Sequence, residues 1–202
     1  MRINTVRLRA MIGWLGMLLP WAVVLLVGDF PNSISNTWYT NACTVFMIVL
    51  GSASILLMCY QGYEKVDDIT LTLAGVAGLG VCLFPCSIKD SADRVGTFLI
   101  DKDISNVIHS VSAIIFFALL AYNSIFLFTK GDGSPTKKKK VRNVIYIVSG
   151  VGMIASFLLL LLPYFPVKIW LVETIALFFF GISFLTKADI YPWLFCDTPY
   201  TD

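Results

Sequence analysis

Six long apolar stretches dominate the sequence and leave little chain for anything else. They cover about residues 11–28, 40–60, 69–86, 104–128, 144–162 and 169–186 of the 202 residues. The hydrocarbon core of a bilayer is about 30 Å thick, and about 20 apolar residues in a helix cross it. A helix also satisfies its own backbone polar groups within that layer. We therefore expect an all-α polytopic membrane protein, residues 1–202, built as one bundle of six transmembrane helices.

The composition excludes a soluble globular domain. Hydrophobic residues make up 57% of the chain, charged residues make up only 14%, and the mean hydropathy is +0.80. Charged residues account for about 25% of an average soluble domain. The basic start, MRINTVRLRA, is also typical of a signal peptide. No small-residue cleavage pattern follows the first stretch, so we expect that stretch to be retained as a helix.

The distribution of Lys and Arg predicts the orientation. With six spans both termini lie on one side of the membrane, and loops rich in Lys and Arg favour the cytoplasm. Eleven of the 15 basic residues fall on the side of the termini: Arg2, Arg7, Arg9, Lys65, Lys130, Lys137, Lys138, Lys139, Lys140, Arg142 and Lys187. The other four are Lys89, Arg94, Lys102 and Lys168. We therefore expect a multi-pass protein of the cytoplasmic (plasma) membrane with both the N and C termini in the cytoplasm.

The densest basic cluster is TKKKKVR, residues 136–142. Runs of this kind also occur in nucleic-acid-binding and nuclear-import segments. Here the run lies between two apolar stretches, and the net charge of the chain is only +2. We interpret it as a cytoplasmic loop that attracts anionic lipid headgroups. Membrane lipids are the expected partners, and no nucleic acid is expected.

Two ionisable residues of the usual functional kind lie inside the apolar stretches. His109, the only histidine, follows the start of the fourth stretch, and Glu173 follows the start of the sixth. An ionisable group at the centre of a transmembrane helix costs at least ~2.5–3.5 kcal/mol, so it marks a candidate site. Both residues are expected at a similar depth in the outer leaflet, where a shared proton or ion pair would couple them. The alternative for His109 is a packing residue that hydrogen-bonds across the bundle.

Other side chains are expected in the same layer. Asn41 lies at the outer end of the second stretch, Cys82 at the outer end of the third, and Ser112 shares a helical face with His109. We take these three, with His109 and Glu173, as candidate ligand-binding residues around a cavity that opens toward the outside.

The cysteines and the single histidine limit the chemistry. Cys43, Cys82 and Cys86 lie on the expected outer, oxidising side. Two interpretations stay open. Cys43 forms a disulfide with Cys82 or Cys86, or the three side chains pack as small apolar residues. One histidine does not match hydrolases that hold zinc with several histidines, so we expect no metal and no cofactor.

Small residues mark places where helices approach closely. The run LAGVAGLGVC puts Ala74, Gly75 and Gly78 on neighbouring faces of the third stretch. Such stripes allow close helix packing in a bilayer, and they would also suit a homo-oligomer.

Three segments carry a resemblance to known proteins. GVCLFP ends the third stretch, IHSVSAIIFF opens the fourth, and WLVETIALFFFGISFLTK forms the sixth. In these the chain resembles bacterial six-span proteins of unknown function and, more distantly, the DRAM/Frag/Sfk-type family. The shared positions are His109, Ala113, Phe116, Phe117 and Glu173. The resemblance implies a multi-span protein associated with lipid handling or membrane organisation rather than with established catalysis.

The sequence leaves three functions open. The leading hypothesis is a non-enzymatic integral membrane protein with an outer-leaflet cavity for a lipid or small ligand. The second is a channel or transporter, in which oligomers would be expected. The third is a lipid-modifying enzyme that uses His109 as a base and Glu173 as its orienting partner.

Overall fold

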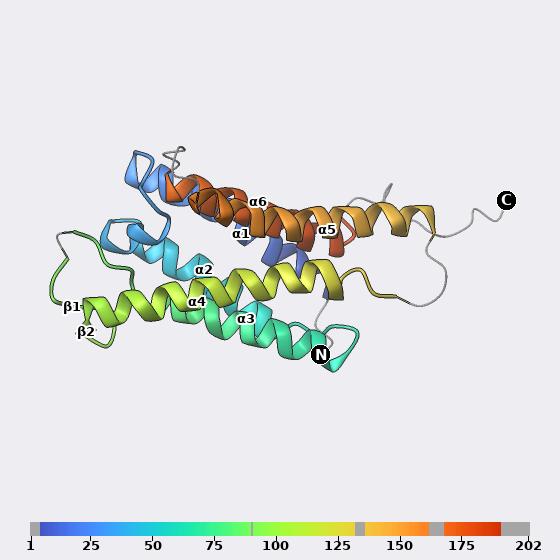
Figure 1. Ribbon diagram of the computed structural model, residues 1–202, viewed down its shortest axis with the longest axis horizontal. Helices are drawn as coiled ribbons and strands as arrows, with labels where there is room; N and C mark the ends of the chain where they lie inside the picture. The colour runs from blue at the N-terminus through green and yellow to red at the C-terminus, as the bar shows by residue number, and fades with distance from the viewer. Residues whose placement is uncertain (1–4, 90, 132–135, 162–167, 191–202) are drawn as a thin grey trace.

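The chain folds into six α-helices with short connections, as the computed structural model shows for residues 5–89, 91–131, 136–161 and 168–190 (Figure 1). The order is α1 (Thr5–Val27), η1 (Ser35–Tyr39), α2 (Cys43–Met58), α3 (Lys65–Leu83), β1 (Arg94–Val95), β2 (Ile100–Asp101), α4 (Lys102–Tyr122), η2 (Asn123–Leu127), α5 (Lys137–Leu158), η3 (Leu159–Leu161) and α6 (Ile169–Lys187). The elements η1 and η3 are 3-10 helices, and η2 is a π-helix that extends α4. The predicted all-α class is confirmed.

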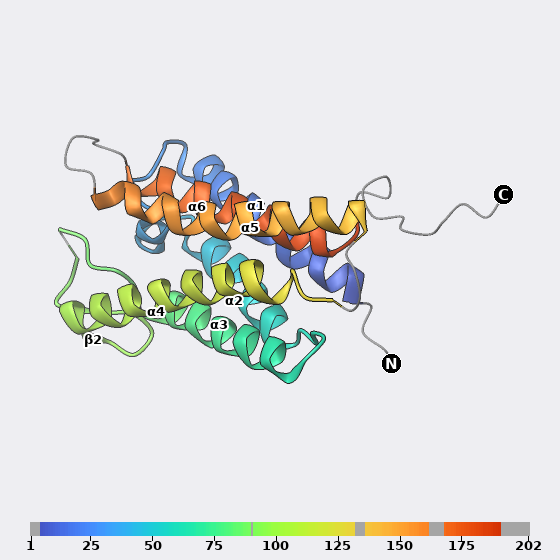
Figure 2. The same cartoon turned by 45° about the vertical axis from the view of Figure 1, so that its right-hand side comes forward.

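The six helices form a closed ring in chain order. Each helix packs against the next one along the chain, and α6 returns to pack against α1. The views agree that α1, α5 and α6 lie together and that α2, α3 and α4 lie together (Figures 1 and 2). α5 packs against η2, the extension of α4, more extensively than against Lys102–Tyr122. The loosest part of the ring therefore lies between α5 and Lys102–Tyr122.

The two ends of the ring differ in chemistry. We call the end with residues 28–42 and 84–101 the hairpin end, because β1 and β2 form an antiparallel pair there. We call the end with residues 59–64, 128–131 and 136–140 the basic end. Lys130 and Glu64 form an ion pair at the basic end, with 2.6 Å between Nζ and Oε2.

Five helices are long and apolar enough to cross a membrane: α1, α3, α4 with η2, α5 and α6. The sixth, α2, is apolar but has only 16 residues. It is shorter than the predicted stretch 40–60 because the chain before it turns as η1. In this turn Thr37 Oγ1 donates to the Ile34 carbonyl (2.6 Å) and Thr40 Oγ1 to the Thr37 carbonyl (2.9 Å).

Three helices begin earlier than hydropathy predicts, because polar residues form their first turns. α1 begins at Thr5 rather than 11, α3 at Lys65 rather than 69, and α5 at Lys137 rather than 144. A reciprocal pair of side-chain bonds between Glu64 and Asp67 caps α3, and the Thr136 side chain caps α5. The basic cluster is thus helical. The predicted end of the fifth stretch at 162 lies outside the described residues.

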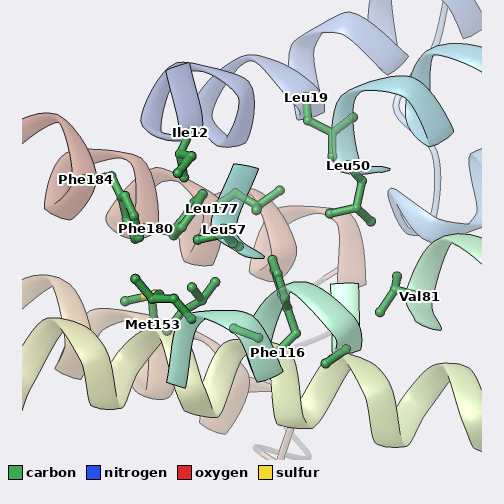
Figure 3. Packing of buried hydrophobic residues seen from close by; sticks show 14 of the residues in the cluster. Ile12, Leu19, Leu50, Leu57, Val81, Phe116, Met153, Leu177, Phe180 and Phe184 are labelled. Carbon is green, nitrogen blue, oxygen red and sulfur yellow. The ribbon is translucent and has the colours of Figure 1, made fainter. Parts of the chain in front are cut away.

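A column of aromatic rings runs through the interior of the ring, starting at the contact between α4 and α5. Successive ring centroids are 4.8 to 6.5 Å apart. The rings, from the hairpin end toward the basic end, belong to Phe157, Phe117, Phe116, Phe180, Phe184 and Phe128. Figure 3 shows buried side chains from all six helices in this interior, including Phe116, Phe180 and Phe184. We call these six rings the aromatic column.

Small residues let neighbouring helices approach closely inside the ring. A Cβ at Gly75 of α3 would lie 2.4 Å from the Ser54 carbonyl oxygen of α2. A Cβ at Gly181 of α6 would lie 2.9 Å from the Gly13 carbonyl oxygen of α1. The predicted stripe in the third stretch therefore packs within the chain, against α2.

Candidate functional site

Glu173 lies in the second turn of α6 and fastens the loop between α1 and α2. Ser33 Oγ donates to both carboxylate oxygens, at 2.8 Å and 3.0 Å. The Ile34 N–H donates to Oε2, and Ser35 Oγ lies 3.5 Å from Oε1. The carboxylate accepts these bonds at the start of η1, so one acidic side chain orders a whole connecting segment.

Further contacts hold the same loop against the start of α6. The Trp170 N–H donates to the Asn32 carbonyl (2.8 Å). The Trp170 ring contacts Phe30 edge-on, with 4.9 Å between ring centroids. These contacts and those of Glu173 together hold the loop against the first two turns of α6.

A central cavity of about 60 Å³ lies beside Glu173. Its lining comes from all six helices and the η1 loop. The residues are Leu19, Ile34, Ser35, Phe46, Leu50, Val81, Ala113, Phe116, Phe117, Phe157, Glu173 and Leu177. Among these side chains only Ser35 and Glu173 are polar, so the central cavity is an apolar space with one acidic corner.

A second space of about 260 Å³ lies between α4 and α5, where the ring is loosest. Its lining is entirely apolar: Ala113, Ile114, Phe117, Ala118, Met153, Ile154, Phe157 and Leu158. We call it the α4–α5 groove. Ala113, Phe117 and Phe157 line both spaces and therefore form the wall between the groove and the central cavity. The Phe117 and Phe157 rings lie 4.8 Å apart, centroid to centroid.

His109 has a different environment. Its Nδ1 lies 2.8 Å from the Phe84 carbonyl oxygen and donates to it, because a carbonyl oxygen can only accept. Ser105 Oγ donates to the next carbonyl, that of Pro85 (2.8 Å), and Asn106 Oδ1 accepts from the Ser87 N–H (2.9 Å). These α4 side chains satisfy backbone groups that the end of α3 leaves unpaired. His109 is buried and acts as a packing and capping residue.

Tyr39 adds a further tie at the hairpin end. Its O–H donates to the Cys86 carbonyl (2.7 Å) and so links η1 to the segment after α3. Burial raises the pKa of Tyr39 above its ordinary value. The phenol therefore stays protonated, and remains a donor, through the neutral range.

Comparison of the chain with protein-family models, curated proteins and solved structures found no match. The geometry of this chain is therefore the basis for any functional conclusion.

The structure does not gather the five sequence-predicted ligand residues at one place. Glu173 lines the central cavity, whereas the other four are not among the lining residues. Asn41 Nδ2 donates to the Leu26 carbonyl at the end of α1 (2.8 Å), Cys82 is buried in α3, and Ser112 packs against Gly80.

His109 and Glu173, both within the described part of the chain, share no hydrogen bond. The partners of His109 come from the end of α3, and those of Glu173 come from the loop before η1. Ala113, Phe116, Phe117 and Glu173 line the central cavity, and His109 does not.

The cysteines that the structure describes, Cys43, Cys59, Cys82 and Cys86, are all free thiols. Cys86 Sγ donates to Asn36 Oδ1 (3.1 Å). No cluster of three His, Cys, Asp or Glu side chains suited to a metal ion occurs in the described ranges.

Sequence reasoning missed the partners of Glu173 and the aromatic wall. Ser33 and Ser35 lie two positions apart in a turn-like segment, PNSIS. Nothing in that segment indicates that the two serines bind a carboxylate. Phe117 and Phe157 look like ordinary lipid-facing residues of two apolar stretches. Only the contact of the two rings across α4 and α5 makes them a shared wall.

Proposed function

We propose that the protein is a non-enzymatic integral membrane protein that binds a lipid or a similar amphipathic ligand, with a short segment of the ligand in the central cavity and its apolar chain in the α4–α5 groove. The α4–α5 groove is the entrance, and Ser35 and Glu173 receive the polar part of the ligand. The single observation that carries this proposal is an apolar cavity with one acidic corner, separated from a larger apolar groove only by Ala113, Phe117 and Phe157.

The chemistry of the two spaces supports a ligand of this kind. Binding pockets for small molecules are mostly apolar, with a few polar groups that fix orientation. An apolar cavity stays dry and favours an apolar guest. Glu173 can accept a hydrogen bond from a hydroxyl or ammonium group of the ligand. Lipid handling is also what the family resemblance implies.

The proposal places all six helices across the cytoplasmic (plasma) membrane, with both termini in the cytoplasm and the central cavity in the outer leaflet. The 16 residues of α2 span about 24 Å at ~1.5 Å per residue, and η1 and its flanking residues add length at the hairpin end. The excess of Lys and Arg at the basic end supports this orientation.

The interior supports binding over the two alternative functions. A channel needs a wetted path, whereas buried rings of the aromatic column occupy the interior of the ring. A lipid-modifying enzyme that used His109 as base and Glu173 as partner would need a hydrogen bond between them. These residues instead bond to separate backbone segments.

Photolabelling tests the proposal. The protein is reconstituted with a phospholipid that carries a diazirine in its acyl chain, irradiated and digested, and labelled peptides are mapped by mass spectrometry. Leu177 of α6 is 5% exposed and lines the central cavity. We expect labelling at Leu177 in the wild type, and a drop of about tenfold in Ala113→Phe, because the added ring fills the wall region.

The control for this experiment is Ala155→Phe, which adds the same ring to an exposed position of α5 outside both spaces. It should label like the wild type. If Ala113→Phe does not fold, Phe117→Ala serves instead and should increase labelling by opening the wall. An unlabelled Leu177 in the wild type, or equal labelling in a folded Ala113→Phe, would overturn the proposal.

A further inference from the structure

A third cavity, of about 230 Å³, lies at the basic end, away from the central cavity. Three cationic side chains line it: Arg9 from α1, Lys130 from the segment after η2, and Lys187 from the end of α6. Tyr60, Tyr63 and Asp67 line it as well. Residues that are distant in sequence thus give this cavity more positive than negative side chains.

Among the residues that the structure describes, two of the cations have only neutral hydrogen-bond partners. Arg9 Nε donates to the Tyr60 hydroxyl (3.1 Å), and Arg9 Nη1 lies 3.3 Å from the Lys187 carbonyl oxygen. Lys187 Nζ lies 3.4 Å from the Phe128 carbonyl oxygen and 5.0 Å from the centre of the Phe128 ring. Within the described residues neither side chain forms an ion pair.

Lys130 differs from the other two, because it already has a carboxylate partner. Its Nζ lies 2.6 Å from Glu64 Oε2 at the surface, and this hydrogen bond raises the pKa of Lys130. The positive charges of Arg9 and Lys187 are therefore the ones that an anion would neutralise.

Asp67 supplies the second part of the site. The residue is only 5% exposed. Its Oδ2 accepts from the backbone N–H groups of Tyr63 (2.7 Å) and Glu64 (3.1 Å). Its Oδ1 is buried and has no hydrogen-bond partner among the described residues. A buried acceptor without a donor is costly, so this carboxylate lacks one hydrogen-bond donor.

We propose that this cavity binds a phosphate ester with a neighbouring hydrogen-bond donor. Arg9 and Lys187 hold the phosphate, and an ammonium or hydroxyl group beside the phosphate donates to Asp67. Guanidinium groups match the geometry of phosphate oxygens, and a lysine ammonium adds a point charge. Phospholipid headgroups and soluble phosphate esters share this chemistry. The site is independent of the function proposed for the central cavity.

Two binding measurements test the site and distinguish the sources. The first titrates glycerol phosphate into the full-length protein in detergent, and calorimetry follows binding. The second uses native mass spectrometry to measure retention of phosphatidylethanolamine against phosphatidylcholine with the same acyl chains, because choline has no donor. Binding of glycerol phosphate identifies a soluble ligand, and preferential retention of phosphatidylethanolamine identifies a lipid headgroup. Either result supports the phosphate site.

The variants separate the cavity from general surface charge. In Arg9→Gln with Lys187→Gln we expect affinity to fall by at least about tenfold, because both phosphate contacts are lost. Lys140→Gln removes one charge from an exposed position of the basic cluster outside the cavity and should change affinity less than about twofold. If the double variant does not fold, Arg9→Lys takes its place. This substitution keeps the positive charge but should still weaken binding, because the guanidinium geometry is lost.

Two results would overturn the proposal. One is a wild-type protein that binds neither glycerol phosphate nor phosphatidylethanolamine in preference to phosphatidylcholine. The other is a folded double variant that binds as tightly as the Lys140→Gln control.

Discussion

Glu173 is an acidic side chain in an apolar helix, and its neighbours explain how the helix tolerates it. A charge in a transmembrane helix is costly, and donors from the protein must replace the water that it loses. Ser33, Ile34 and Ser35 supply those donors from three consecutive residues of one loop. The same bonds order the loop, so Glu173 has a structural role as well as a proposed ligand role.

The bond from Ser33 gives the first prediction at this scale. Ser33→Ala removes the hydroxyl that reaches both carboxylate oxygens, and we expect the free energy of unfolding to fall by ~1–3 kcal/mol. Ser52→Ala, at an exposed position of α2, should change it by less than ~0.5 kcal/mol. Denaturant unfolding in detergent, followed by tryptophan fluorescence, provides the comparison. Equal stability of the two variants would contradict the role given to Ser33.

The residue scale also shows what the sequence reveals about a site. Glu173 and His109 stand out because ionisable groups are costly in apolar stretches. Their partners do not stand out: Ser33 lies 140 positions from Glu173, and the partner of His109 is a backbone carbonyl 25 positions away. A backbone acceptor has no sequence signature. The sequence therefore marks both side chains without distinguishing a capping histidine from a cavity carboxylate.

At the scale of elements, hydropathy locates the helices, and capping chemistry determines where they begin. All six predicted stretches overlap observed helices, but the charged first turns of α3 and α5 lie outside those stretches. Glu64 with Asp67 and Thr136 are recognisable capping residues. These capping residues mark the starts of α3 and α5, which hydropathy alone does not indicate. The shortening of α2 depends on bonds within η1, which no periodicity indicates.

Helix spacing gives the second prediction. A Cβ at Gly75 would lie 2.4 Å from the Ser54 carbonyl oxygen, whereas a Cβ at Gly51 of α2 would meet nothing within 4 Å. We expect Gly75→Ala to force α2 and α3 apart and to cost about 1–3 kcal/mol of stability. Gly51→Ala should be neutral or should stabilise by up to ~1 kcal/mol, because alanine favours a helix. Thermal unfolding of the two variants in the same detergent distinguishes them, and a stabilised Gly75→Ala would refute the close contact.

At the scale of the whole molecule, the prediction concerns membrane topology. In a variant without its five native cysteines, single cysteines replace Asp29, Gln61, Asp93 or Lys140. A membrane-impermeant thiol reagent should label positions 29 and 93 in intact cells, and positions 61 and 140 only after permeabilisation. This pattern follows if every helix crosses the bilayer and the termini are cytoplasmic. Labelling of positions 29 and 61 from the same side would show that α2 does not cross.

The closed ring also sets an order in time. The partner of α1 that completes the ring is α6, which is synthesised after α2, α3, α4 and α5. Until then Gly13 of α1, which Leu185 and Gly181 cover in the finished structure, has no α6 to pack against. Neighbouring helices between them can pair as soon as both are made, but α1 must wait for α6. Correct folding therefore depends on this face of α1 staying unpaired until more than a hundred further residues have been synthesised.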